Sequence, residues 1–151
     1  MAESTQSSTH VDAPAAKVLA VIADLEHYPQ WAGGVKDVEV LAVTAGRPSQ
    51  ARFVVDNGPI KDTYVLDYTW TVTKAGTGTV SWQLVSADII SRLDGSYELA
   101  QDGDGTEVTY RLSVDVRIPM LGMLKRKAEK VIIETALKDL TAQVGAERKQ
   151  S

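Results

Sequence analysis

The sequence contains no cysteine among its 151 residues, which excludes disulfides, thiolate nucleophiles, iron–sulfur clusters and thiolate zinc sites. Its two histidines, His10 and His27, show no metal-ligand spacing, so we expect no metal and no cofactor, and a structural or surface role for both. A Gly-x-Ser-x-Gly nucleophile motif and a phosphate-binding loop followed by lysine are also missing. From these absences we assign no catalytic residue.

Basic charge and long apolar runs are scarce as well. The net charge is −4 and the pI is near 5.1, whereas nucleic-acid-binding domains are usually strongly basic, so we expect no nucleic-acid partner. The longest helical apolar run, residues 18–23, is too short to span a bilayer. The opening MAESTQSSTH lacks the basic and apolar regions of a secretory signal, and we expect a cytoplasmic protein.

The chain is expected to form one domain over residues 1–151. This length suits a single domain, and no internal repeat or low-complexity segment interrupts it. Hydrophobic residues make up 44% of the sequence, which is ordinary for a globular protein and excludes a disordered chain.

The periodicity of apolar residues predicts the order of elements. A first strand is expected over Ser7–Val11, a helix over Ala15–Asp24 and a short helix over Leu25–Trp31. From Val35 onward, apolar residues recur at every second position, as in antiparallel strands with one solvent-exposed face. After Pro119 they return to the helical spacing of 3.6 residues. Six strands are expected in this region, at residues 35–44, 51–55, 63–72, 80–84, 89–99 and 107–118. Gly95 is expected to form a bulge in the fifth of them. The pattern predicts an α+β fold with an antiparallel sheet and a long C-terminal helix that ends near Val144.

Five short segments, in this order, resemble the START-like, or SRPBCC, superfamily, with the closest likeness to its polyketide cyclase/dehydrase-type branch. They are Asp12-Ala13-Pro14, the segment from Asp24 to Trp31 (DLEHYPQW), Gly95-Ser96-Tyr97-Glu98-Leu99, the segment from Gly105 to Tyr110 (GTEVTY), and Ile118-Pro119. The resemblance implies a helix-grip fold, in which a seven-stranded curved antiparallel sheet with two short helices grips the long C-terminal helix. It also implies a hydrophobic small molecule as partner, while one fold of this kind serves several unrelated functions.

The tyrosines and tryptophans of the strands favour a pocket. Most of them fall on the strand positions that should face the helix, and the chain has only one phenylalanine. A dry core would favour phenylalanine, because buried hydroxyl and indole N–H groups need hydrogen-bond partners. The alternative is that tyrosine and tryptophan simply favour strands.

The final helix carries two apolar stripes on nearly opposite sides. The first consists of Leu121, Leu124, Ala128, Val131, Ile132 and Thr135, and the second of Ile133, Leu137, Leu140 and Val144. We expect the second stripe to be buried within the chain rather than to form a dimer face, and both monomer and homodimer remain open. The predicted ligand-binding residues are Phe53, Tyr64, Leu66, Tyr68, Trp70, Trp82, Tyr97, Tyr110, Leu124, Ala128, Val131 and Thr135.

Three functions fit this sequence. The leading hypothesis is binding or transfer of a hydrophobic molecule, which is aromatic, polyketide-like or a lipid, between the sheet and the C-terminal helix. The alternatives are an aromatase/cyclase-like enzyme acting on polyketide intermediates, and a protein-interaction domain with a collapsed cavity. The basic residues 125–127 after an apolar segment also fit membrane contact, which is the weaker interpretation because stable anchoring usually needs a second signal.

Overall fold

The computed structural model of the chain describes residues 4–56, 61–117 and 122–150, and the side chains of residues 122–124 and 147–150 lie outside this description. The elements follow the predicted order: β1 (Thr5–Val11), α1 (Ala15–Ala23), the 3-10 turn η1 (Leu25–His27), α2 (Tyr28–Trp31), β2 (Val35–Thr44), β3 (Arg47–Asp56), β4 (Lys61–Val72), β5 (Gly78–Ala87), β6 (Ile90–Asp102), β7 (Gly105–Val116) and α3 (Gly122–Gln150). The long helix therefore extends beyond its predicted end.

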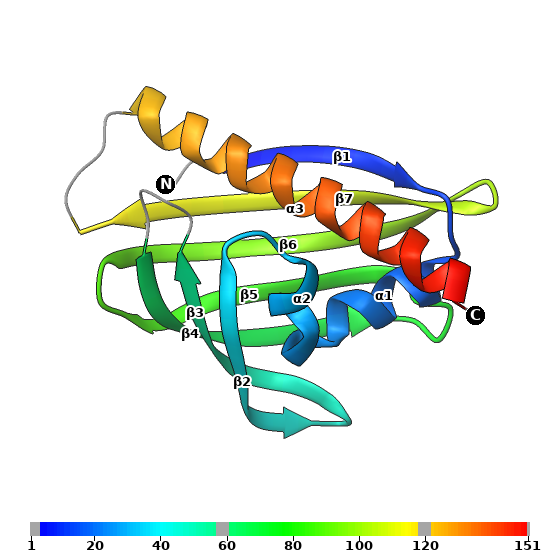
Figure 1. The fold of residues 1–151 in the computed structure, drawn as a ribbon, viewed down its shortest axis with the longest axis horizontal. Coiled ribbons are helices and arrows are strands. Elements are labelled where there is room, and N and C mark those ends of the chain that lie inside the picture. Colours follow the sequence, from blue (N-terminus) through cyan, green and yellow to red (C-terminus); the bar gives the residue numbers. More distant parts are fainter. Residues whose placement is uncertain (1–3, 57–60, 118–121, 151) are drawn as a thin grey trace.

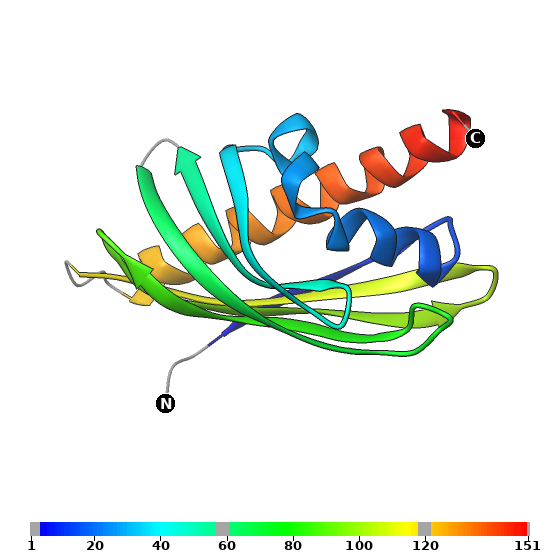
Figure 2. The same cartoon turned by 90° about the horizontal axis from the view of Figure 1, so that it is seen from below.

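The seven strands form one antiparallel sheet in the order β1-β7-β6-β5-β4-β3-β2. The sheet is strongly curved, and the three helices lie on its concave side, with α3 crossing over β7 and β1 (Figures 1 and 2). The predicted helix-grip fold is thus confirmed. None of the described helices is long and apolar enough to cross a membrane.

Helix α3 is attached to the sheet by its second apolar stripe. Ile133, Leu137, Leu140 and Val144 are all buried within the chain, as predicted. Val131 lies on the opposite side, because two positions along a helix correspond to a rotation of about 200° between residues 131 and 133. Its side chain is 56% exposed, so the prediction that Val131 faces the sheet is wrong.

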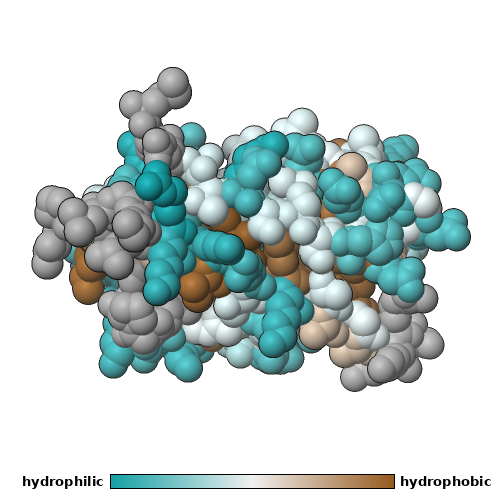
Figure 3. Space-filling model, turned by 90° about the horizontal axis from the view of Figure 1, so that it is seen from above, coloured by the Kyte–Doolittle hydropathy of each residue, from teal (hydrophilic) through white to brown (hydrophobic). Residues whose placement is uncertain are grey.

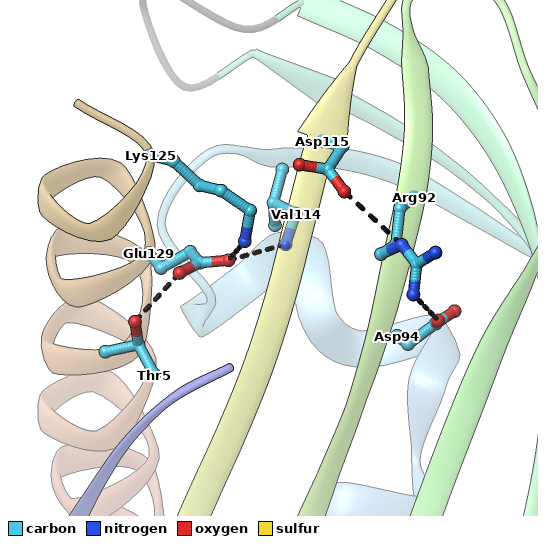
Figure 4. A network of polar contacts seen from close by, with 7 residues as sticks. All are labelled: Thr5, Arg92, Asp94, Val114, Asp115, Lys125 and Glu129. Atoms are coloured by element: carbon cyan, nitrogen blue, oxygen red, sulfur yellow. Dashed lines mark hydrogen bonds and ion pairs between the residues drawn. The ribbon is translucent and has the colours of Figure 1, made fainter. Parts of the chain in front are cut away.

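A buried carboxylate, Glu129, joins α3 to the edge of the sheet. Only 1% of Glu129 is exposed. Strand β1 begins opposite Leu112, so the N–H of Val114 lies beyond the end of the β1–β7 ladder and donates instead to Glu129 at 2.8 Å. Glu129 also accepts a hydrogen bond from the Thr5 hydroxyl at 2.8 Å and pairs with Lys125 one turn earlier (Figure 4). It therefore holds the start of β1, the end of β7 and helix α3 together.

Strands β5 and β6 are paired along only part of their length. Their ladder runs from Gly78↔Leu99 to Trp82↔Gly95 and stops there. Beyond that point, residues 83–87 pair only with β4 and residues 90–94 only with β7, so the sheet divides as it approaches the turn at residues 88–89 (Figure 1). The register irregularity in β6 lies between Ile90 and Arg92, and the bulge predicted at Gly95 is not present.

Two side chains from neighbouring strands hold the turn at the open end of this division. The carboxylate of Asp62 on β4 accepts hydrogen bonds from the backbone N–H groups of Asp88, Ile89 and Ile90 at 2.8–3.1 Å, and from that of Thr63. From the other side, Arg117 donates to the carbonyls of Ala87 and Asp88. Burial would raise the pKa of the Asp62 carboxyl, but the four N–H donors together outweigh it and lower the pKa below its ordinary value.

We expect Asp62→Ala to lower the free energy of unfolding by about 3 kcal/mol, because the backbone N–H groups of Asp88, Ile89 and Ile90 would lose their acceptor and β5 offers none at this end of the sheet. Since the folded-state pKa is lowered, the stabilisation by Asp62 is complete above the unfolded-state pKa of about 4 and is lost as the pH falls through the folded-state value. Urea unfolding at several acidic pH values measures both effects. Asp67→Ala, on the exposed face of the same strand, is the control and should change stability by less than about 0.5 kcal/mol; equal losses in the two variants would contradict this role for Asp62.

Candidate functional site

The aromatic side chains of the sheet meet on its concave face. Alternation along the strands brings Phe53 from β3, Tyr64, Tyr68 and Trp70 from β4, Trp82 from β5, Tyr97 from β6 and Tyr110 from β7 to this face. Successive ring centroids are 4.7–6.5 Å apart, so the rings form one continuous layer across five strands. Leu66 is buried in the same face. The strand positions predicted for the site therefore do come together.

Trp82 lies at the centre of this aromatic layer. Its ring is 5.5 Å from that of Tyr97 and 5.6 Å from that of Tyr110. It lies directly over Gly95 on the neighbouring strand, where a Cβ atom would be only 2.5 Å from Cζ2 and 2.7 Å from Cε2 of the indole. Glycine at this position thus serves close packing of the tryptophan ring.

The hydroxyl groups of this layer distinguish it from an ordinary core. Tyr97 and Tyr110 are only 6% and 7% exposed, and Tyr64 and Tyr68 are half-buried. In the described part of the chain, none of these four hydroxyls forms a hydrogen bond. Every polar side-chain atom that is fully buried there does have a hydrogen-bond partner. The four hydroxyl oxygens are therefore not fully buried, and water can reach them. The rings are packed, while their hydroxyl oxygens keep some solvent-accessible surface.

Tyr28 provides the contrast. It comes from α2, contacts Trp31 at 5.0 Å and Phe53 at 6.3 Å, and donates a hydrogen bond from its hydroxyl to the carbonyl of Ile22 at 2.5 Å. Tyr28 therefore packs α1 and α2 against the aromatic layer and keeps its polar atom satisfied. The sequence analysis missed this residue because it lies in a short helix rather than on an alternating strand.

Burial raises the pKa of all four tyrosines whose hydroxyls lack a partner, and like-charged neighbours add to the effect. Each phenol is therefore neutral near pH 7 and acts as a hydrogen-bond donor rather than as a base. No three His, Asp or Glu side chains in residues 4–56, 61–117 and 122–150 come together as metal ligands would. Both histidines lie at the surface, where His10 pairs with Asp102 and His27 with Asp24.

One flank of helix α3 faces the core and the glycine that follows α2. Ile132 packs against the core beside the buried stripe, and Asp139, seven residues later, lies on the same flank and accepts a hydrogen bond from the N–H of Gly33 at 2.8 Å. Thr135 is exposed at this margin, close to Gly33, and Ala128 is half-buried. The Leu124 side chain and Leu121 lie outside the described residues. The role of all these positions in ligand binding stays a prediction.

Two hollows lie on the surface of the described part of the chain, away from the concave face. One, of about 420 Å³, lies beside Asp62 and is lined by charged side chains that include Lys36, Asp56 and Lys61. The other, of about 350 Å³, lies on the outer face where β5 and β6 diverge, among Asp67, Thr69, Ser81, Gln83, Asp94 and Ser96. The first hollow also contains Val54, Val55 and Ile89, and the second reaches the ring of Trp82, which is the one predicted ligand-binding residue in the lining of either.

The outer face of the sheet carries an ion-pair cluster on β6 and β7. Arg92 forms ion pairs with Asp94 at 3.6 Å and with Asp115 at 3.3 Å on the outer face, so neither Arg92 nor Asp94 turns inward (Figure 4). In the face seen in Figure 3, hydrophilic residues alternate with residues of intermediate hydropathy, and hydrophobic patches lie between them near the middle of the molecule. The aromatic layer thus combines largely buried rings with four hydroxyl groups that have no hydrogen-bond partner in the described part of the chain.

We expect Tyr28→Phe to lower the free energy of unfolding by about 1 kcal/mol, because it leaves the buried carbonyl of Ile22 without its donor. Tyr97→Phe and Tyr110→Phe should each change the stability of the ligand-free protein by less than about 0.5 kcal/mol, since these hydroxyls donate to no protein group. Urea unfolding of the three single variants measures the difference. A loss for Tyr97→Phe or Tyr110→Phe as large as that for Tyr28→Phe would show that those hydroxyls are engaged within the protein.

Comparison with known proteins agrees with this architecture. A START superfamily protein from Mycobacterium smegmatis has 23% sequence identity and a TM-score of 0.87, over 95% of this chain and 97% of that one. The Zhui aromatase/cyclase from Streptomyces sp. R1128 has 16% identity and a TM-score of 0.73, over 100% and 97% of the two chains. A STAR-related lipid transfer protein from Xanthomonas axonopodis has 22% identity and a TM-score of 0.72, over 93% and 85%.

These three structures share the fold with this chain, at identities too low to transfer a substrate. No curated protein has a sequence that matches the chain. The sequence profile of the family described as polyketide cyclase / dehydrase and lipid transport matches residues 11–141, which is most of the chain. The chain therefore belongs to the polyketide cyclase/dehydrase and lipid transport family, within the START-like superfamily.

Proposed function

We propose that the protein binds or transfers a hydrophobic small molecule in the space between the concave face of the sheet and α3. The observation that carries this proposal is the set of four tyrosine hydroxyls that border water-accessible space although their rings are largely buried. An aromatic layer supplies apolar contact worth about 25 cal/mol per Å² of buried area, and the phenol tips orient the ligand.

The alternatives gain less support from this geometry. A protein-interaction domain with a collapsed cavity would leave those hydroxyls buried without partners, at a cost of about 1–3 kcal/mol each. An aromatase/cyclase-like enzyme needs a group that accepts a proton near neutral pH, and burial raises the pKa of each tyrosine away from that range. Similarity to an aromatase/cyclase and to a lipid transfer protein supports a polyketide-like or lipid ligand equally.

A matched pair of substitutions on α3 tests the location of the site. Ile132→Trp places a large ring on the flank beside the core, whereas Val131→Trp places the same ring on the exposed side of the helix. We expect Ile132→Trp to weaken binding of the neutral dye N-phenyl-1-naphthylamine at least about ten-fold, equivalent to about 1.4 kcal/mol, and Val131→Trp to leave it unchanged. Dye fluorescence titration measures both affinities.

Mass spectrometry of the protein purified under non-denaturing conditions provides an independent readout, because a bound hydrophobic ligand would add its own mass. Equal dye binding by the wild type and both variants would place the site elsewhere. Absence of dye binding to the wild-type protein, together with absence of a co-purified ligand, would contradict the proposed function itself.

A further inference from the structure

The hollow on the outer face of the sheet lies where the pairing of β5 and β6 ends. The last pair of that ladder is Trp82↔Gly95, and both residues belong to the lining of the hollow. Its volume of about 350 Å³ is at the lower end of the range of roughly 300–1,000 Å³ that small-molecule sites occupy. The hollow therefore has room for one small ligand, on the side of the sheet opposite to the helices.

The indole of Trp82 has an unpartnered donor next to this hollow. The residue is 7% exposed, and its Nε1 donates no hydrogen bond in the described part of the chain. Since every fully buried polar side-chain atom there has a partner, this N–H keeps some solvent-accessible surface although the residue is more than nine-tenths buried. Nε1 is bonded to Cε2, and Cε2 and Cζ2 are the indole atoms that lie against Gly95. The donor is thus beside the residue at which the ladder ends.

Polar side chains from three strands surround the same point on the outer face. Thr69, Ser81 and Ser96 form a row across β4, β5 and β6, because they are successive register partners. Gln83 lies in the next row, opposite Asp67. The side chains of Thr69, Ser81, Gln83 and Ser96 form no hydrogen bond within the described residues. Directly opposed residues have Cβ atoms about 4.5–5.5 Å apart, so one small ligand can contact several of these groups together.

Two carboxylates complete the lining of the hollow. Asp67 accepts a hydrogen bond from Nε2 of Gln50 at 2.9 Å, and Asp94 pairs with Arg92 at 3.6 Å (Figure 4). A carboxylate can accept about four hydrogen bonds, so both retain acceptor capacity toward the hollow.

The arginines on this face of β6 and β7 are already paired. Arg92 also contacts Asp115 at 3.3 Å. Arg111, the register partner of Ser96, donates to Gln6 and pairs with Glu98. None of the residues that line the hollow is basic. An anionic ligand would therefore meet two carboxylates and no cation in the lining itself.

This set of donors and acceptors suits a ligand with several hydroxyl groups. Each hydroxyl can both donate and accept, so such a ligand can donate to Asp67 and Asp94 and accept from the N–H of Trp82. An apolar ligand would displace water from these groups without replacing its hydrogen bonds. A simple cation would make no use of the Trp82 donor.

We propose that this hollow is a second binding site, on the outer face of the sheet, for a neutral polyhydroxylated ligand the size of one sugar ring, with the N–H of Trp82 as a donor at its floor. The site is separate from the hydrophobic site and does not depend on the function proposed above. Trp82 belongs to both, because its ring also contacts Tyr97 and Tyr110 in the aromatic layer.

Two glycosides with the same ring test this proposal: methyl β-D-glucopyranoside, which is neutral, and methyl β-D-glucopyranosiduronate, which carries a carboxylate. The three tryptophans each give one indole N–H resonance in a ¹H–¹⁵N NMR spectrum. The neutral glycoside should shift the Trp82 resonance saturably and leave that of Trp70 unchanged, because the Trp70 N–H donates to the carbonyl of Pro48 at 2.6 Å. The anionic glycoside should bind at least about three-fold more weakly.

A matched pair of leucine substitutions on β5 tests the location of the site. Ser81→Leu fills the hollow from the middle of its row and should weaken binding of the neutral glycoside at least about ten-fold. Thr79→Leu places the same side chain at the next outward position of β5, outside the lining, and should leave the affinity unchanged.

A third variant tests the charge of the lining. Asp67→Asn keeps an oxygen that can accept from Gln50 but removes one negative charge, so the preference for the neutral glycoside should fall at least about two-fold. An unchanged preference would overturn the role given to this carboxylate.

The other outcomes decide whether the site exists. Absence of a saturable shift of the Trp82 resonance at up to about 100 mM neutral glycoside overturns the proposal, since binding weaker than this is not specific. Equal weakening by Ser81→Leu and Thr79→Leu, or equal affinity for the two glycosides, also overturns it. A shift of the Trp82 resonance by N-phenyl-1-naphthylamine and not by the glycoside would place the N–H toward the concave face. None of these results affects hydrophobic binding, which the dye titration measures separately.

Discussion

The alternation of side chains along the long strands is the constraint on which the rest of the structure depends. A strand that buries one face must place every second residue there, and the strands from β3 to β7 place rings at those positions. Because the sheet is curved, these rings converge toward α3 instead of spreading over a flat surface. The same alternation sends the charged residues of β6 and β7 to the outer face, where they pair with one another.

Two buried carboxylates maintain the shape that this alternation requires. Glu129 replaces the missing ladder partner of Val114 where β1 has not yet begun, and Asp62 replaces missing partners at the turn between β5 and β6. Both act where the sheet runs out of strand-to-strand hydrogen bonds. A carboxylate can accept several N–H donors at once, which suits it to sheet edges and wide turns.

The sequence predicts the fold well because its strongest signals are periodic. The strand β7 alternates without interruption, the stripe containing Ile133 and Leu140 has helical spacing, and both features appear in the structure as expected. The aromatic positions Tyr64, Tyr97 and Tyr110 follow from the same alternation.

Other features depend on contacts between distant segments and leave no periodic signal. The role of Gly95 is an example, since its spacing in the strand indicates a bulge, whereas the structure uses it to accommodate the ring of Trp82. Glu129 is a charged residue on a helix, and the spacing of apolar residues cannot show that its side chain is buried. Tyr28 lies in a helix too short to show helical spacing of apolar residues. Val131 was misplaced because two apolar stripes on one helix compete, and only packing against the sheet decides between them.

The partial pairing of β5 and β6 has a mechanical consequence for the site. Between residues 83 and 94 the two strands share no ladder hydrogen bonds. If the angle between the β2–β5 part of the sheet and the β6–β7–β1 part changed, the hydrogen bonds of Asp62 and Arg117 at the turn would be strained, because no ladder joins the two parts there. Trp82 lies at the vertex of this division, in contact with rings from both parts. A change in the curvature of the sheet would therefore be concentrated along this unpaired segment, and the ring of Trp82 would be displaced with it because it contacts rings on both sides.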